Sequence, residues 1–264
     1  RKLNRVGIKI NTYIMNYPKR IIQKGETNKS IVKAVQTKLN EVGCGPISVD
    51  GDFGNQTFSA VKLFQSTRKD KNGSPLIVDG KIGAITWEVL FGSNTIPVQD
   101  NTTNAFLSEL VKAAQNEIGT LEVPLGSNKG PRIKQYLNSV GLDEGYYWCA
   151  AFVYFCANQA ASVLGKSNPV YKTAGCLSHW NNTTATKITK QQAIDNPSLI
   201  KVGSIFIIDH GGGMGHTGIV TSVEGGYIHT IEGNSNPEGS SNGIGVFELI
   251  RKISSIQKGF IIYK

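Results

Sequence analysis

Apolar residues recur at helical spacing in the N-terminal part of the chain. Four of them follow a candidate helix cap at Asn28 or Ser30: Ile31, Val32, Val35 and Leu39. This spacing predicts a helix. The apolar runs FSAVKLFQ (58–65) and WEVLFG (87–92) predict two more. The pattern therefore predicts a small module of about three helices.

A nine-residue motif, VDGxxGxxT, occurs at Val49 and again at Val78. Each Asp-Gly pair predicts a tight turn, and the second glycine of each copy would occupy a position free of Cβ strain. The threonines Thr57 and Thr86 would cap the helices that follow. The repeat thus predicts that two similar turns hold the three helices together.

Asp50 and Asp52 raise the alternative of a metal site, because two acids flank a glycine in the first turn. Lys81 replaces the second acid in the other copy, and no glutamate downstream completes a calcium loop. The turn interpretation is favoured.

The C-terminal part changes from helical to strand periodicity. Helices are predicted at 106–114, at 133–140 and from residue 149 onwards, followed by a loop-rich middle. Short apolar runs then predict strands at 203–208, 217–223, 226–231, 243–250 and 259–263. Helices followed by an antiparallel sheet give an α+β fold, here joined to a small helical domain.

These patterns divide the chain into four parts: a basic segment (1–25), a helical domain (26–92), a polar linker (93–104) and a larger domain (105–264). Val6, Ile8 and Ile10 alternate within the first part. They would suit an edge strand, an arm against the helical domain or a remnant of a longer protein.

The chain carries a net charge of +9, and most of this charge belongs to its N-terminal part. Residues 1–95 contain 15 Lys and Arg and 7 Asp and Glu, a net +8. A basic face suits an anionic partner such as a wall polymer, nucleic acid or lipid headgroup, and an ordinary solvated surface explains it equally well. No recognition motif supports nucleic acid, and no apolar run is long enough for a membrane span.

Candidate chemistry begins at Cys149, where the aromatic run YYW gives way to a helix-forming run. The first turn of a helix offers free N–H groups and the positive end of the peptide dipole, which favour a thiolate. Downstream, His216 lies in GHTGIV and Glu232 in IEGN. A cysteine, a histidine and an orienting polar residue suit a thiol hydrolase.

Strand alternation predicts that His216, Gly218 and Val220 share one face. We expect this face to meet the helix of Cys149, with Gly218 leaving room for close approach. Glu232 would point the same way from the next strand.

The other histidines are poor candidates. His229 should point away from Glu232, while His210 and His179 are expected at the surface or in turns. Four cysteines are too few and too irregular for a disulfide framework or zinc site. Cys156 is expected to be a small buried thiol, and Cys44 and Cys176 receive no role.

The sequence resembles two families. VKAVQTKLNEVG and the two VDG motifs, over residues 26–92, are similar to the three-helix peptidoglycan-binding domain of cell-wall hydrolases. YYWCAAFVYFC, GHTGIV, IEGNSNPEG and GSNKGPRIKQYL, over 105–264, resemble the CHAP branch of the papain-like NlpC/P60 superfamily.

The CHAP resemblance implies that Cys149 is the nucleophile, His216 the base and Glu232 the third residue, with Asn234 as an assisting amide. The acidic calcium-binding segment of some phage CHAP domains is absent, so no metal and no cofactor is expected. Both N-acetylmuramoyl-L-alanine amidases and stem-peptide endopeptidases occur in the family.

We therefore expect a peptidoglycan hydrolase such as a phage lysin, an autolysin or an antibacterial effector. It would act as a monomer in the periplasm or outside the cell, with peptidoglycan as its partner and an immunity or inhibitor protein as a further candidate. The chain opens without a signal peptide, which leaves open an export signal removed before Arg1. The alternatives are an inactive wall-binding protein and, supported by charge alone, a nucleic-acid binder.

Overall fold

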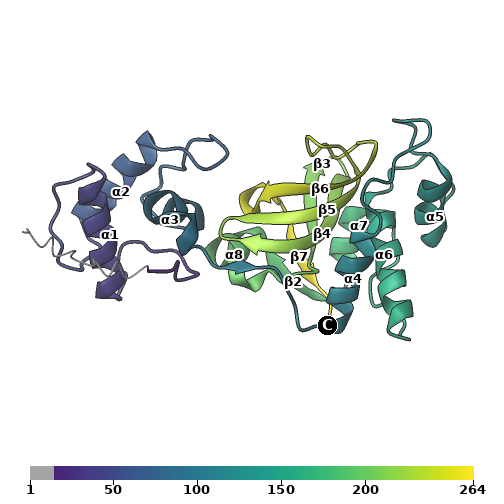
Figure 1. Cartoon of the computed structure of the whole chain (residues 1–264), viewed down its shortest axis with the longest axis horizontal. Helices are drawn as coiled ribbons and strands as arrows, with labels where there is room; N and C mark the ends of the chain where they lie inside the picture. The colour runs from purple at the N-terminus through teal and green to yellow at the C-terminus, as the bar shows by residue number, and fades with distance from the viewer. Residues whose placement is uncertain (1–14) are drawn as a thin grey trace, which may run out of the picture.

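The computed structural model describes residues 15–264, and the N-terminal helical domain lies at one end of the molecule (Figure 1). The α-helices are α1 (Lys29–Glu41), α2 (Asn55–Thr67), α3 (Ala84–Phe91), α4 (Ala105–Gln115), α5 (Pro131–Ser139), α6 (Cys149–Val163), α7 (Cys176–Asn182) and α8 (Lys190–Asp195). The strands are β1 (Val98–Gln99), β2 (Thr186–Thr189), β3 (Ile205–Gly211), β4 (Met214–Glu224), β5 (Tyr227–Ser235), β6 (Gly245–Lys252) and β7 (Gly259–Ile262). Three short 3₁₀ helices are η1 (Ser93–Thr95), η2 (Pro197–Leu199) and η3 (Ile253–Ser255). The predicted α+β class is confirmed, with helices at 105–163 preceding most of the sheet.

Helices α1, α2 and α3 form the predicted helical module around a shared core that includes Val35, Phe64 and Trp87. Asn28 caps α1, since its side chain accepts hydrogen bonds from the first-turn amides Ser30 N and Ile31 N. The module therefore begins where the sequence pattern placed it.

Two buried glutamines explain the repeat. Gln36 Nε2 donates to Asp50 Oδ1 at 2.8 Å, and Gln36 Oε1 accepts from Gly51 N at 2.9 Å. Gln65 makes the same pair of bonds with Asp79 and Gly80 in the second copy, at 3.0 and 2.8 Å. Each turn is therefore fastened to the helix before it.

The predicted threonine caps are wrong, because Gly54 and Gly83 occupy the N-cap positions of α2 and α3. Thr57 lies inside α2 and accepts a hydrogen bond from Gln36 Nε2 at 3.1 Å. Its hydroxyl is thus used by the glutamine network. The glycines that need a positive φ are the first of each copy, Gly51 and Gly80, at +83° and +73°.

The described part of the basic segment packs on the helical domain. Tyr17 is buried against Trp87, and Ile22 forms a bridge with Ile82. The alternating residues Val6, Ile8 and Ile10 lie outside the described residues.

Six strands follow the antiparallel order β2-β7-β3-β4-β5-β6, and β1 pairs with β4. One face of the sheet shares a core with α4, α5 and α6 and contributes, among others, Ile207, Ile219 and Ile231. The other face shares a second core with α8 and η3 and includes Phe206, Val220 and Ile228. Between residues 93 and 104, Val98 and Gln99 pair with Glu224 and Val223 at the end of β4.

The middle of the larger domain is more ordered than the sequence pattern indicated, since it contains α7, β2 and α8. His179 lies on α7 and is buried, with its Nε2 2.7 Å from the hydroxyl of Tyr263. The prediction that His179 is a surface or turn residue is therefore wrong. Burial, together with the nearby charge of Lys187, lowers the pKa of His179 to about 4.

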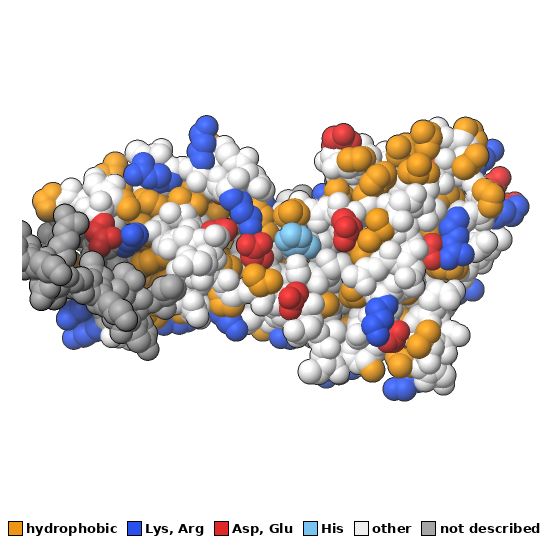
Figure 2. All heavy atoms as spheres, in the orientation of Figure 1, with side chains coloured by type: hydrophobic (Ala, Val, Ile, Leu, Met, Phe, Trp, Pro, Cys, Tyr) orange, Lys and Arg blue, Asp and Glu red, His pale blue; other side chains and the backbone are white. Residues whose placement is uncertain are grey.

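The helical domain packs directly on the sheet of the larger domain. Lys252 on β6 contacts Asp70 Oδ2 at 2.5 Å, and Lys71 lies 3.3 Å from Glu224 Oε2 on β4. In the space-filling view the outline narrows where the domains meet, and acidic and basic side chains lie close together there (Figure 2).

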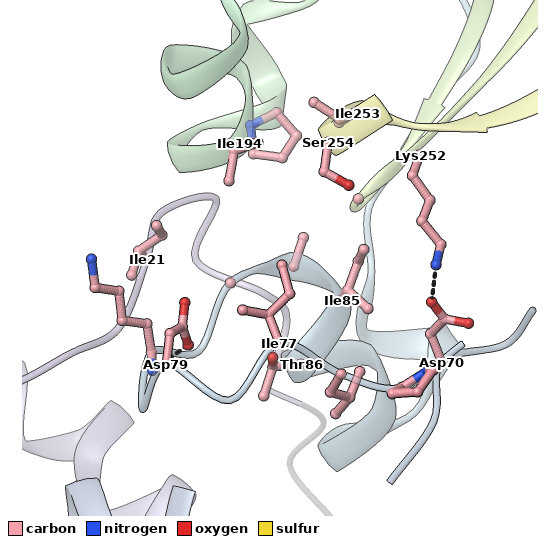
Figure 3. Close-up of a pocket in the computed structure, with 17 residues that line it drawn as sticks. Ile21, Asp70, Ile77, Asp79, Ile85, Thr86, Ile194, Lys252, Ile253 and Ser254 are labelled. Carbon is pink, nitrogen blue, oxygen red and sulfur yellow. Dashed lines mark hydrogen bonds and ion pairs between the residues drawn. The ribbon is translucent and has the colours of Figure 1, made fainter. Parts of the chain in front are cut away.

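A cavity of about 170 Å³ remains between the domains. Ile77 and Ile85 of the helical domain line it from one side, and Ile194 and Ile253 line it from the other (Figure 3). Gly226 lies at the same contact, where a Cβ atom would fall 2.3 Å from Ile85. The interface is therefore apolar at its centre and carries ion pairs beside it. Among residues 15–264, no helix is long and apolar enough to cross a membrane.

Candidate active site

Cys149 is the first residue of α6, so its thiol lies beside the free amides of the first helical turn. Trp148, immediately before it, is completely buried and stacks on Tyr136 at 5.4 Å between ring centroids. The indole Nε1 of Trp148 donates to Glu122 Oε1 at 2.8 Å. This anchored indole fixes the position at which α6 begins.

His216 on β4 and Glu232 on β5 come from neighbouring antiparallel strands and are both fully buried. His216 Nε2 lies 2.7 Å from Glu232 Oε2. An ionised carboxylate can only accept, so Nε2 carries the proton and Nδ1 is left available. Nδ1 is buried and has no aligned hydrogen-bond partner among the described residues.

Glu232 is held from three sides. Arg251 on β6 donates to both carboxylate oxygens at 2.5 Å, and Thr230 Oγ1 donates to Oε1 at 2.6 Å. A guanidinium fork fixes the plane of a carboxylate as well as its charge. The acid that holds His216 is therefore itself immobilised.

The pKa of Glu232 falls to about 2 although burial would raise it, because the hydrogen bonds from Arg251 and His216 favour the carboxylate. Burial would lower the pKa of His216, but the neighbouring Cys149 and Glu232 anions raise it to about 9. The raised pKa favours the imidazolium form of His216 at neutral pH.

The pKa of the Cys149 thiol lies well below its usual value. The first cause is a hydrogen bond with the Cys176 thiol, whose sulfur lies 3.4 Å away, and the second is His216 beside it. Together with the amide of Ala150 these interactions outweigh burial. The lowered pKa of Cys149 and the raised pKa of His216 both favour a thiolate beside an imidazolium.

Cys176 has the opposite behaviour. Its hydrogen bond with Cys149 and its own burial raise its pKa well above the usual value. Either sulfur could donate in this contact, and the opposite pKa shifts of the two thiols favour Cys176 as the donor. Cys156 is fully buried further along α6, as expected, and burial raises its pKa as well.

The strand alternation is correct, but the body of α6 packs against the face opposite to the one predicted, and only Cys149, at the start of the helix, interacts with His216. Val220 packs with the α8 core, whereas Ile219 packs with α6. The space at Gly218 is used by Glu232, whose Cγ lies 2.8 Å from where a Cβ would be. Close approach of α6 occurs at Gly233 instead, where a Cβ would fall 2.6 Å from Phe152.

Asn234 lies at the start of α6 rather than beside the imidazole. Its Oδ1 accepts from Trp148 N at 3.4 Å, and its Nδ2 donates to Asn128 Oδ1 at 3.0 Å and to Gly243 O at 3.2 Å. No hydrogen bond joins it to His216 among the described residues. Asn234 therefore supports the backbone that leads into Cys149.

The remaining histidines lie elsewhere. His210 is exposed and contacts Ser241 at 2.8 Å, and His229 is partly exposed near Glu224 at 3.7 Å. The structure thus brings Cys149, His216 and Glu232 together and leaves these two histidines apart.

Sequence reasoning missed Cys176, Arg251 and Glu122. The signal for Cys176 was a second cysteine directly after a glycine, in AGCLSHW, at the start of a short helix. Arg251 lies near the end of β6 and is opposite Ile228 in the strand register, so no local pattern relates it to Glu232.

The Cys149 side chain is nearly buried, but two residues just before it are exposed. Cys149 is only 4% exposed, whereas Tyr146 and Tyr147, just before it, are 57% and 47% exposed. Trp148 belongs to the packing beneath the helix, and the two tyrosines lie on the surface. No group of three or more metal-ligating side chains is found within residues 15–264.

Comparison with protein-family models gives two matches. Residues 141–234 match the CHAP domain, and residues 28–90 match a peptidoglycan binding domain. No curated protein and no solved structure matches the chain. Both domain matches confirm the resemblances drawn from the sequence motifs.

Proposed function

Since this chain combines an N-terminal peptidoglycan-binding domain with a CHAP domain, we propose that it cleaves an amide bond of the peptidoglycan stem peptide through Cys149, His216 and Glu232. A CHAP domain implies a peptidoglycan hydrolase, either an amidase or an endopeptidase, that acts in the periplasm or outside the cell. The observation that supports this proposal best is the buried His216, bonded to Glu232 through Nε2 and adjacent to the Cys149 thiol.

In the proposed reaction, the Cys149 thiolate attacks the amide carbonyl carbon and a C–S bond forms. The negative charge moves to the carbonyl oxygen, where backbone N–H groups at the start of α6 stabilise it, including that of Cys149. His216 Nδ1–H then protonates the leaving amine as the C–N bond breaks.

The thioester is hydrolysed in the second half of the reaction. His216, now neutral, takes a proton from water, and the hydroxide attacks the thioester carbonyl carbon. The C–S bond breaks and the thiolate is restored beside the imidazolium. Glu232 keeps the imidazole in one tautomer and orientation throughout.

Asn234 and Glu122 act as positioning residues in this proposal. Asn234 accepts from the amide of Trp148, and Glu122 accepts from its indole. Both contacts hold the turn that presents the first amides of α6 to the oxyanion.

The test compares Cys149→Ala with Cys156→Ala, a control on the same helix that removes a buried thiol outside the site. On purified peptidoglycan, Cys149→Ala should lose at least about 10³-fold in digestion rate and still bind the wall. Cys156→Ala should digest the wall as the unaltered protein does.

Mass spectrometry of the released fragments identifies the bond. Separated sugar and peptide chains indicate an amidase, and cut cross-links indicate an endopeptidase. Digestion by Cys149→Ala would remove the nucleophile assignment. Wall binding without digestion by the unaltered protein would instead favour an inactive wall-binding protein.

A further inference from the structure

A second thiol lies inside the candidate active site. Cys176 begins α7, and its sulfur lies 3.4 Å from that of Cys149 at the start of α6. All four cysteines belong to the described residues, all are free, and this is the only pair within hydrogen-bonding range. The peptidoglycan cleavage proposed above uses only one of these two thiols.

The position of Cys176 is set by its packing on β4. A Cβ atom at Gly215 would fall 3.2 Å from Cys176 Cβ, so the glycine beside His216 is what admits α7 at this distance. Both sulfurs are carried by buried residues, with Cys176 only 6% exposed. The pair is thus held in place by two elements packed on one strand.

We propose that Cys149 and Cys176 form a reversible disulfide when the protein meets a peroxide, and that this bond switches the hydrolase off. The two sulfurs must approach each other for this bond to form, because a disulfide requires sulfurs about 2.05 Å apart. From 3.4 Å, a closure of roughly 1.4 Å is needed, which is within reach of rotating the two short side chains.

The first step consumes one molecule of hydrogen peroxide. The Cys149 thiolate attacks a peroxide oxygen, the O–O bond breaks, and hydroxide leaves and takes the proton of the His216 imidazolium. The products are a sulfenic acid on Cys149 and one water.

In the second step the sulfur of Cys176 attacks the sulfenic sulfur. The S–S bond forms, the S–O bond breaks, and the departing hydroxide takes the Cys176 proton and leaves as water. In total, two thiols and one peroxide give one disulfide and two waters. A dithiol reductant such as dithiothreitol reverses the change by thiol–disulfide exchange.

The two cysteines have complementary roles in this chemistry. The sulfur that attacks the peroxide must be a thiolate, the form that the lowered pKa of Cys149 favours, and this part rests on the proposed function. The resolving sulfur must be close, and Cys176 is the only thiol near it among the described residues. Without Cys176, the sulfenic acid would be oxidised further to irreversible acids.

The experiment treats the full-length protein with hydrogen peroxide and maps its cysteines by mass spectrometry. We expect a loss of two hydrogens, a cross-linked peptide containing Cys149 and Cys176, and at least about tenfold loss of wall digestion that dithiothreitol restores. Cys176→Ala should form no cross-link, gain two or three oxygen atoms on Cys149, and not recover its own untreated activity.

Cys156→Ala is the matched control and should behave as the unaltered protein. Cys176→Ser gives the same test if the alanine variant does not fold, and mapping of the unaltered protein needs no variant. Oxygen addition at Cys149 without a cross-link in the unaltered protein would overturn the inference. Because the cross-link is detected by mass, its formation is read independently of whether the chain digests peptidoglycan.

Discussion

At the scale of single residues, the site depends on how charge is shared among buried groups. His216 is fully buried, which by itself disfavours the imidazolium, yet its pKa is raised to about 9 by Cys149 and Glu232. Arg251 keeps Glu232 ionised, so the acid remains an anion throughout the physiological range. The thiolate–imidazolium pair is therefore favoured by residues on three adjacent strands, β4, β5 and β6, and at the start of two helices, α6 and α7.

This balance predicts the pH dependence of activity. The reactive pair is lost as pH rises through the pKa of His216, near 9, and as pH falls through the lowered pKa of Cys149. Glu232→Gln removes the anion that favours the imidazolium. We expect the alkaline limb of kcat/KM to move about 1–3 pH units lower, with roughly 10²-fold lower activity at neutral pH.

The measurement is a pH profile of kcat/KM on a soluble stem-peptide substrate. Glu248→Gln on β6 is the control, since Glu248 is exposed and should leave both limbs in place. An unchanged alkaline limb in Glu232→Gln would show that the carboxylate does not act through His216.

The sequence identified Cys149, His216 and Glu232 because each lies at a position with a local signature: a helix start, a glycine-spaced strand and an acid two residues before an amide. Arg251 has no such signature, and the one at Cys176, a cysteine directly after a glycine, does not relate it to Cys149. Their proximity to the site arises only when α7 and β6 take their places beside β4 and β5. Contacts between distant segments are not encoded in local periodicity.

At the scale of elements, the strand and helix predictions were close wherever the apolar period was clear. The helices of Phe106, Ile133 and Cys149 and all five predicted strands are present. The segment 176–195 was missed because its helices and strand are only four to seven residues long, too short to show a period.

The repeat in the helical domain also contains more than its visible motif. The spacing of the two VDG turns was readable, but Gln36 and Gln65, which fasten them, lie in the preceding helices. A polar residue on the buried face of a helix looks like an interruption of the pattern until its partners are known.

This arrangement predicts equal roles for the two glutamines. Gln36→Ala and Gln65→Ala should each leave a buried glycine amide without its acceptor, Gly51 N or Gly80 N. We expect each variant to lose about 1–3 kcal/mol of stability, measured by thermal or urea unfolding.

Gln56→Ala on α2 provides the comparison, because Gln56 is exposed and makes no side-chain hydrogen bond in the described residues. Its unfolding midpoint should stay within experimental error of the unaltered protein. Equal stability of all three variants would mean that the glutamine bonds do not hold the turns.

At the scale of the whole molecule, the relation between the two domains could not be predicted from sequence. The segment 93–104 reads as a polar linker, yet Val98–Gln99 pairs with β4 and Ile96 is buried in the helical domain's core. The apolar residues at the domain contact, such as Ile85, also look like ordinary helix positions. Docking depends on the complementarity of two folded surfaces, which no single segment reveals.

If the chain cleaves peptidoglycan as proposed, the docked arrangement should matter most on an insoluble wall, where the peptidoglycan-binding domain would present the substrate to the CHAP domain. Asp70 is buried at the interface, and its main cationic partner is Lys252. Lys252→Met leaves this carboxylate without its ion pair, at a cost of about 1–3 kcal/mol. We expect a lower unfolding temperature and a larger loss of activity on whole peptidoglycan than on a soluble stem peptide.

Lys258→Met is the control that distinguishes the loss of the interface ion pair from a general effect of removing a lysine. Lys258 pairs with Asp209 at 3.0 Å within the larger domain, and its side chain is 38% exposed, against 26% for Lys252. This variant should reduce both activities equally or not at all. If Lys252→Met also reduces them equally, the ion pair stabilises the fold without contributing to the presentation of the wall, and the two domains act on peptidoglycan independently.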